Sequence, residues 1–170
     1  MTSLSIRPAT AADLPELHAL IERSYRGEAS RKGWANEAHL LTRPRTDPAT
    51  LAAIIADPEQ VMLVGKDGGV MRACVQVTNK GGGLAYIGLL AVEPEQQAAG
   101  IGRIMLAAAE NAATGFGATR FEMTVVSVRD TLIAYYERRG YELTGEIRPF
   151  PHDLIEKGKL LEFVVLAKTV

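Results

Sequence analysis

Two hydrophobic patterns alternate along the chain: continuous apolar runs, and apolar residues at helical spacing. Tyr86–Val92 is a nearly continuous apolar run, which predicts a strand covered on both faces. Pro94 ends this strand, because proline lacks the N–H that a sheet ladder needs. A long helix is predicted to begin near Gly100–Ile101, since the apolar positions that follow recur three and four residues apart: Ile101, Ile104, Met105 and Ala108.

The same patterns predict the other elements. We expect strands at Ser3–Arg7, Gln60–Gly65, Val70–Thr78, Phe121–Val126, Tyr141–Arg148 and Leu160–Lys168. We expect helices from the N-cap Thr10 to about Ser24, at Asn36–Leu41, at Thr50–Ala56, and at Thr131–Arg139 with Ser127 or Asp130 as its cap. The Asp-Gly pair at 67–68 predicts a hairpin, so three strands form a meander before the long helix crosses over. This order predicts an α/β (α+β) fold: one domain over residues 1–170, with a mixed, mostly antiparallel sheet of six to seven strands flanked by helices.

The composition is that of a globular protein that acts away from nucleic acids and membranes. The chain has 170 residues, of which 47% are hydrophobic and 23% charged, and its net charge of −1 lacks the basic excess on which nucleic-acid binding rests. No apolar run is long enough to span a bilayer and the N-terminus lacks the pattern of a signal peptide, so a cytoplasmic location is expected. The single cysteine, Cys74, excludes an internal disulfide and is expected to fill space in the core.

A loop rich in small residues, Gln97–Gly102, lies between the apolar strand and the long helix. The first N–H groups of a helix have no intrahelical partner and carry the positive end of the helix dipole. Gly100 and Gly102 have no Cβ, so a large anion can approach those donors, and Arg103 adds a cation just inside the helix. These features predict a pyrophosphate site. The alternative is a tight turn that binds no ligand.

Two familiar phosphate-binding motifs do not fit this loop. The dinucleotide fingerprint needs a third small residue that is missing after Gly100-Ile101-Gly102, and no Gly-Lys-Ser/Thr run exists for a Walker loop. The loop instead resembles the Q/R-x-x-G-x-G/A motif of the GNAT (GCN5-related N-acetyltransferase) superfamily, with Gln97, Gly100 and Gly102 in register. A second segment, Ala134–Tyr141, resembles the family motif in which an aromatic pair, an acidic and a basic residue precede Gly-Phe or Gly-Tyr.

The resemblance implies that acetyl-CoA is the cosubstrate and that the family sheet splays open at its central strands to admit it. Backbone groups of Leu90 and Val92 are then expected to pair with the pantetheine, and the loop N–H groups to hold the pyrophosphate. The residues implied in CoA binding are Leu90, Ala91, Val92, Gln97, Ala98, Ala99, Gly100, Ile101, Gly102, Arg103, Arg129 and Tyr136. No pair of histidines or acids has metal-ligand spacing, so no metal is expected.

For catalysis, the resemblance implies that Tyr136 protonates the departing thiolate and that the N–H of Leu90 polarises the thioester carbonyl. The alternative for Tyr136 is a ring packed in the core. The sequence departs from the family at Arg129, where asparagine is common, at Leu132, where alanine is common, and at Tyr86, where histone-type members have a glutamate base. The base is therefore left open between Glu37, Glu122, a histidine (His18, His39 or His152) and a water chain.

The acceptor implied by the resemblance is a primary amine, on a small molecule or a peptide. In the family, the segment between the first two helices lines the acceptor site, which here makes Trp34, Glu37, His39 and Arg43 the substrate candidates. Family members often dimerise through late strands such as Leu160–Lys168, so a homodimer is also suggested. Two alternatives to an enzyme are a non-catalytic acyl-CoA-binding regulatory module and an interaction domain that binds no CoA.

Overall fold

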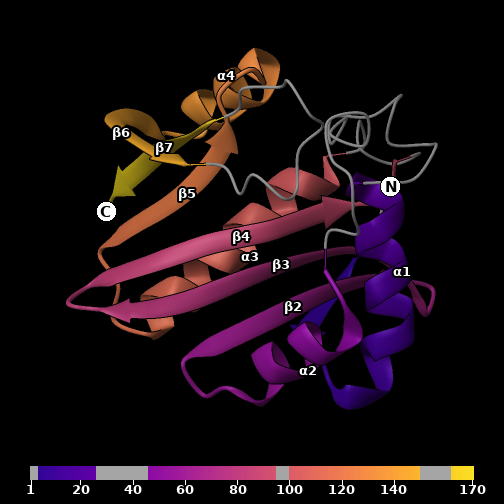
Figure 1. Ribbon diagram of the computed structural model, residues 1–170. Coiled ribbons are helices and arrows are strands. Elements are labelled where there is room, and N and C mark those ends of the chain that lie inside the picture. The colour runs from indigo at the N-terminus through magenta and orange to yellow at the C-terminus, as the bar shows by residue number, and fades with distance from the viewer. Residues whose placement is uncertain (1–3, 26–45, 95–99, 150–161) are drawn as a thin grey trace.

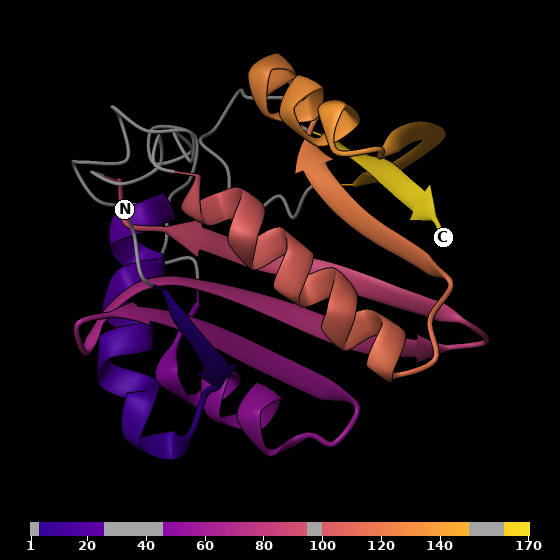
Figure 2. The same cartoon turned by 180° about the vertical axis from the view of Figure 1, so that it is seen from behind.

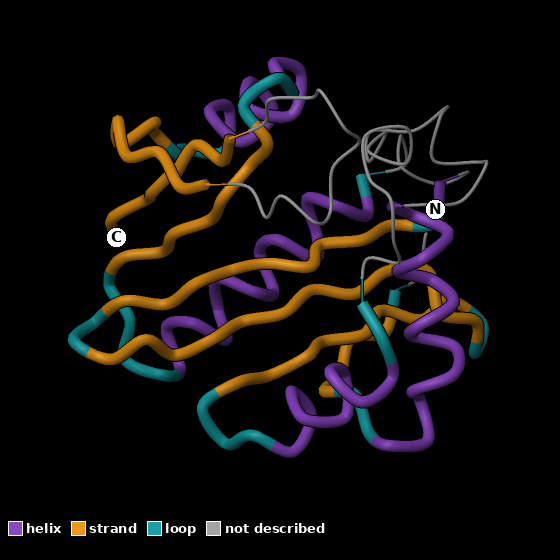
Figure 3. Tube along the Cα trace, in the orientation of Figure 1, coloured by secondary structure: helices purple, strands orange, loops and turns teal. Residues whose placement is uncertain are grey.

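The computed structural model describes residues 4–25, 46–94, 100–149 and 162–170 (Figures 1 and 3). The strands are β1 (Ser5–Pro8), β2 (Gln60–Asp67), β3 (Val70–Gly81), β4 (Leu84–Val92), β5 (Arg120–Val126), β6 (Glu142–Pro149) and β7 (Glu162–Thr169). The helices are a 3-10 turn at Ala11–Asp13, α1 (Leu14–Tyr25), α2 (Pro48–Ala56), α3 (Ile101–Gly115) and α4 (Asp130–Arg138). Their order confirms the predicted α/β sequence of elements. The helix predicted at Asn36–Leu41 lies outside the described residues.

The seven strands form one sheet in the order β1-β2-β3-β4-β5-β7-β6. Neighbouring strands are antiparallel except β4 and β5, which are parallel and are connected by the α3 crossover that parallel pairing requires. β7 lies between β5 and β6, so both of its edges are paired within the chain. The edge strands of the described sheet are β1 and β6, and the homodimer suggested by the resemblance stays a prediction.

Helices cover both faces of the sheet, and each face has its own core (Figures 1 and 2). α1 and α2 pack on one face of β2–β4, where Leu17, Leu20 and Leu51 are fully buried. α3 and α4 lie on the other face, where Met105 and Ala109 of α3 pack in one cluster with apolar residues of β3, β4 and β5. Cys74 is buried in the first cluster, as predicted. Of the described helices, those beside the strands beyond β4 lie on one face of the sheet (Figures 1 and 2).

A charged cap at the start of the first helical segment confirms the predicted N-cap. Thr10 has extended backbone angles, and its N–H donates to Oδ2 of Asp13 at 2.7 Å. Arg7 on β1 donates from both guanidinium nitrogens to the same carboxylate, at 2.8 and 3.0 Å. These hydrogen bonds, with that from Arg7 first, hold the pKa of Asp13 well below its usual range, although the side chain is only 5% exposed. The cap therefore joins β1 to the helix by a buried carboxylate that is charged at neutral pH.

The predicted caps of α4 were wrong. Its N-cap residue is Arg129, whose side chain makes no capping hydrogen bond, while Asp130 is already the first residue of the helix. Asp130 instead places a carboxylate in the first turn, where the helix dipole favours negative charge. The Gly stop signal at the other end was right, because Gly140 has a φ of 96° just after the helix.

Candidate active site

β4 and β5 separate soon after they begin. Only three residue pairs join them, from Leu84↔Arg120 to Tyr86↔Glu122. Beyond these pairs β5 remains hydrogen-bonded to β7 on its other side, while β4 remains paired with β3, so the two halves of the sheet diverge. Figure 1 shows the ribbons of β4 and β5 diverging toward their carboxyl ends, near which α3 and α4 begin, and we call this region of strand separation the opening. This is the splay at the central strands that the resemblance implied.

A bulge interrupts β4 inside the opening. Gly88 pairs with Gln76 and Ala91 with Cys74, so Leu89 and Leu90 together face a single residue of β3. Leu89 has a φ of 47°, and no other non-glycine residue in the described ranges has a positive φ. The bulge lets Leu90 and Val92 pack with the α3 core while Leu89 and Ala91 pack with the α1–α2 core. Such bulges often re-aim backbone and side chains beside functional sites.

The first turn of α3 lies at the open end of β4. Its N-cap, Gly100, has a φ of 80° and, as a glycine, has no side chain to cap the helix. The first intrahelical bond is that of the Ile104 N–H to the Gly100 carbonyl, at 3.2 Å, so the N–H groups of residues 101–103 have no partner within the helix. A Cβ built on Gly100 would lie 3.8 Å from a terminal guanidinium nitrogen of Arg103. These residues can present backbone donors and one cation to an anion.

Two tyrosines of α4 are buried in the core on the α3 side of the sheet. Tyr135 and Tyr136 are 6% and 7% exposed, and their rings meet edge to face at 5.4 Å. The Tyr136 ring also contacts that of Tyr141, at 6.1 Å, so Tyr136 is packed in the core through its ring. The hydroxyl of Tyr135 reaches α3, where it lies 3.5 Å from a Cβ built on Gly102. Sequence reasoning missed Tyr135, although its place in the aromatic pair was the available signal.

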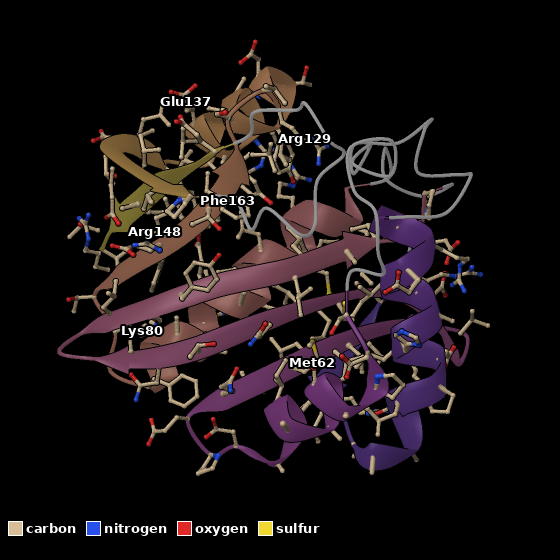
Figure 4. All side chains as sticks on the ribbon, viewed as in Figure 1. Met62, Lys80, Arg129, Glu137, Arg148 and Phe163 are labelled. Carbon is tan, nitrogen blue, oxygen red and sulfur yellow. The ribbon has the colours of Figure 1, made fainter. Side chains whose placement is uncertain are left out.

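The candidate base Glu122 is held in ion pairs. One carboxylate oxygen lies 3.2 Å from a guanidinium nitrogen of Arg148 on β6, and the other lies 3.9 Å from Arg120. Glu122 also belongs to the last pair before β4 and β5 separate, at the closed end of the opening. Both facts disfavour Glu122 as the base. Figure 4 shows Arg148 and Phe163 near β5, the strand that carries Glu122, and Arg129 at the start of α4.

Several predicted site residues lie outside the described residues: Trp34, Glu37, His39, Arg43, Gln97, Ala98, Ala99 and His152. Of the predicted residues that the structure describes, Val92 and Tyr136 are buried in the α3-side core, Leu90 packs against that core, and Gly102 lies beside Val92. His18 is held on α1, with its Nε2 3.3 Å from the Thr46 carbonyl oxygen and 3.7 Å from Glu22. No three acidic, His or Cys side chains of the described ranges form a group that could hold a metal ion.

Comparison with known proteins agrees with this geometry. The sequence profile of the acetyltransferase (GNAT) family matches residues 16–141, more than half of the 170 residues, and the chain belongs to this family. No curated protein matches the sequence. None of the described helices is long and apolar enough to cross a membrane.

The solved structures that resemble this one share its fold at low sequence identity. The ribosomal-protein-S18-alanine N-acetyltransferase from Escherichia coli superposes with a TM-score of 0.76 at 17% identity, covering 99% of this chain and 94% of that chain. YncA, a putative acetyltransferase from Salmonella typhimurium with its cofactor acetyl-CoA, gives 0.73 at 17% identity over 99% and 94%. The PaiA N-acetyltransferase from Thermoplasma acidophilum, in complex with coenzyme A, gives 0.71 at 15% identity over 99% and 99%.

Proposed function

We propose that residues 1–170 form one N-acetyltransferase domain, which transfers the acetyl group of acetyl-CoA to a primary amine by direct attack in a ternary complex. The observation that carries this proposal is the separation of β4 and β5 after three pairs, with the glycine-capped first turn of α3 at its open end. An extended ligand arm can pair with β4 in such an opening, while its phosphates meet helix N–H groups. Family membership and the relatives solved with acetyl-CoA or coenzyme A support the same ligand.

The residues present fit this ligand on two counts. Gly100 adopts a left-handed conformation without a Cβ, and Gly102 leaves a gap beside Tyr135 and Val92 that even a methyl group would fill to van der Waals contact. Both positions therefore leave the first N–H groups of α3 accessible to a bulky anion. In the proposed complex Arg103 neutralises part of the pyrophosphate charge, and Leu90 and Val92 hold the pantetheine by their backbone groups.

In the reaction, acetyl-CoA supplies a thioester whose carbonyl carbon bonds to the amine nitrogen as its C–S bond breaks. The amine attacks as a neutral nucleophile, after its ammonium form has lost a proton to a general base or to a chain of water molecules. The N–H of Leu90 donates a hydrogen bond to the carbonyl oxygen as negative charge develops there. The phenol of Tyr136 gives its proton to the departing sulfur, which leaves as the thiol, and the proton that the nitrogen releases as the amide forms restores the phenol. The acceptor amine, of a small molecule or a peptide, approaches from the α1–α2 side, where the segment holding Trp34, Glu37, His39 and Arg43 connects the two helices.

A calorimetric titration of the full chain with acetyl-CoA tests the proposal. We expect micromolar binding that Gly100→Glu abolishes and Gly100→Ala retains at least in part, because alanine brings the same backbone strain without the negative charge. A panel of polyamines, amino acids and peptide amines, followed by thiol release, then tests transfer. Absence of binding to the wild type would exclude the proposal. Tight binding without turnover on any amine would favour the non-catalytic acyl-CoA-binding module instead.

A further inference from the structure

The closed end of the opening between β4 and β5 has a different lining on each face of the sheet. On the α3 side, Ile87, Met123 and Val125 are at most 4% exposed and pack in one continuous core. Strand alternation places Tyr86 and Thr124 on the α1–α2 side, where both are only partly buried. A ligand group that enters the closed end therefore meets core side chains on one face and these two residues on the other.

The side chain of Tyr86 extends along β4 toward the open end and across to β5. A Cβ built on Gly88 would lie only 2.9 Å from Cε1 of Tyr86, so the ring lies over Gly88, two residues further along β4. The Tyr86 hydroxyl is hydrogen-bonded to Oγ1 of Thr124, which lies two residues beyond the last β4–β5 pair. The ring thus covers the first part of the opening on the α1–α2 face, and the hydrogen bond to β5 holds it there.

The chemistry of the proposed thioester directs its acyl chain toward this ring. A carbonyl carbon is bonded to three atoms in one plane. In the proposed complex its oxygen faces the N–H of Leu90 and its sulfur leads to the pantetheine at the open end, so the acyl chain points toward the closed end. A strand rises about 3.3 Å per residue, so the ring over Gly88 begins no more than about 7 Å from Leu90 along β4. Because carbon atoms in contact are about 4 Å apart, only a short acyl chain fits in the remaining length.

We propose that Tyr86, held by Thr124, restricts the acyl group that this chain accepts to acetyl and excludes acyl-CoA thioesters with longer chains. This inference rests on the proposed function, because it assigns acyl specificity within the same opening. Tyr86 acts through its bulk. A longer acyl chain can enter only if the ring leaves Gly88 and its hydrogen bond to Thr124 breaks, or if the packed core on the α3 side shifts. Inserting methylene groups into space that is already filled is unfavourable in either case.

The test compares CoA with its acetyl, propionyl and butyryl thioesters, in calorimetric titrations of the full chain without an amine. We expect the wild type to bind acetyl-CoA at least about tenfold more tightly than butyryl-CoA, the scale on which a filled pocket rejects an extra methylene group. Tyr86→Ala should bind butyryl-CoA at least as tightly as acetyl-CoA, because the added carbon atoms are buried in the space that the ring leaves. CoA itself, which has no acyl group, should bind the wild type and the variant alike.

Two further substitutions at the same position separate the effect of bulk from effects on folding. Tyr86→Phe is the matched control, because it loses the hydroxyl but keeps the ring, and it should still reject butyryl-CoA. Tyr86→Leu removes part of the volume of the ring and keeps an apolar side chain in the strand, so it provides the test if Tyr86→Ala does not fold. Its ratio of acetyl-CoA to butyryl-CoA affinity should lie closer to one than that of the wild type. Thermal unfolding shows which variants are folded.

The outcomes distinguish this inference from the proposed function. Equal affinity of the wild type for acetyl-CoA and butyryl-CoA overturns the inference and leaves the acetyltransferase proposal standing. A folded Tyr86→Ala or Tyr86→Leu that keeps the wild-type ratio also overturns it, as does a loss of affinity for CoA itself in these variants. No binding of CoA or of any thioester to the wild type overturns both proposals. The inference is upheld when the wild type and Tyr86→Phe reject butyryl-CoA and the variants with smaller side chains accept it.

Discussion

The hydroxyl of Tyr86 on β4 lies 2.5 Å from the hydroxyl oxygen of Thr124 on β5. Tyr86 belongs to the last residue pair between the two strands, and Thr124 is two residues further along β5. The hydrogen bond thus spans the point at which the strands separate. Gly88 makes room for it, because a Cβ there would lie 2.9 Å from the Tyr86 ring. Tyr86, which occupies the position of the glutamate base of histone-type members, therefore connects the two halves of the sheet by a hydrogen bond.

The Tyr86–Thr124 hydrogen bond can be removed with little change in the shape of either side chain. We expect Tyr86→Phe to lower the free energy of unfolding by about 1 kcal/mol, since it deletes one partly buried hydrogen bond. Thr124→Val should cost a similar amount, and the double variant little more than either single one. Urea denaturation measures all three values. Fully additive losses would show that the two hydroxyls do not depend on each other.

The Arg7–Asp13 cap predicts a pH dependence of stability. The pKa of Asp13 is lowered in the folded protein, so its contribution is complete above the usual carboxyl pKa near 4 and declines as the pH falls toward the folded value. We expect Asp13→Asn to lower the free energy of unfolding by about 2 kcal/mol at pH 7, and the difference from wild type to shrink between pH 5 and pH 2. Thermal or urea unfolding across this range measures it. A difference that stays constant with pH would rule out the carboxylate charge as its source.

Gly100 and Gly115 bound the same helix but differ in backbone conformation. Gly100 has a φ of 80°, so Gly100→Ala should destabilise the fold by about 1–2 kcal/mol. Gly115 has no positive φ and no atom within 4 Å of a built Cβ, so Gly115→Ala should be neutral or stabilising by up to about 1 kcal/mol. Denaturant midpoints of the pair provide the measurement. Equal effects at both sites would contradict the left-handed N-cap.

Removing the hydroxyl of Tyr135 and removing that of Tyr136 should change different kinetic constants. Tyr136→Phe is expected to lower kcat about 100-fold or more while the Kd for acetyl-CoA is kept, because only the proton donor is lost. Tyr135→Phe is expected mainly to raise the Kd, because its hydroxyl lies beside Gly102 at the first turn of α3. Steady-state kinetics and calorimetry separate the two effects, and thermal unfolding checks that both variants fold. Unchanged turnover in Tyr136→Phe would remove Tyr136 from the mechanism.

Local patterns along the sequence were sufficient to predict most of the elements. The apolar run at Tyr86–Val92 predicts β4, the Asp-Gly pair predicts the β2–β3 hairpin, and the predicted start of α3 falls at the left-handed Gly100. Each of these features depends on a few neighbouring residues, through strand burial, turn chemistry or the freedom of glycine at positive φ. The first motif could be read for the same reason, because its glycines lie close together in the chain.

Features that depend on distant contacts could not be predicted. Nothing in Leu89-Leu90 signals a bulge, which arises from pairing with β3. The place of β7 between β5 and β6 depends on the order of strands far apart in the chain. The hydrogen bond between Tyr86 and Thr124 exists only because β4 and β5 are neighbours in the sheet, so a sequence pattern shows both as ordinary strand residues.

The short junction between β4 and β5 has a mechanical consequence. β4 and β5 are joined by three residue pairs and by the Tyr86–Thr124 hydrogen bond. We therefore expect the two halves of the sheet to be rigid and the junction between them to be flexible. We expect local opening to be most frequent at the β4–β5 junction. Backbone amides beside this junction should then exchange hydrogen with solvent faster than those of the β2–β3 hairpin. A cosubstrate that contacts both halves of the sheet then stabilises their arrangement, and the melting temperature of the protein should rise with the cosubstrate concentration.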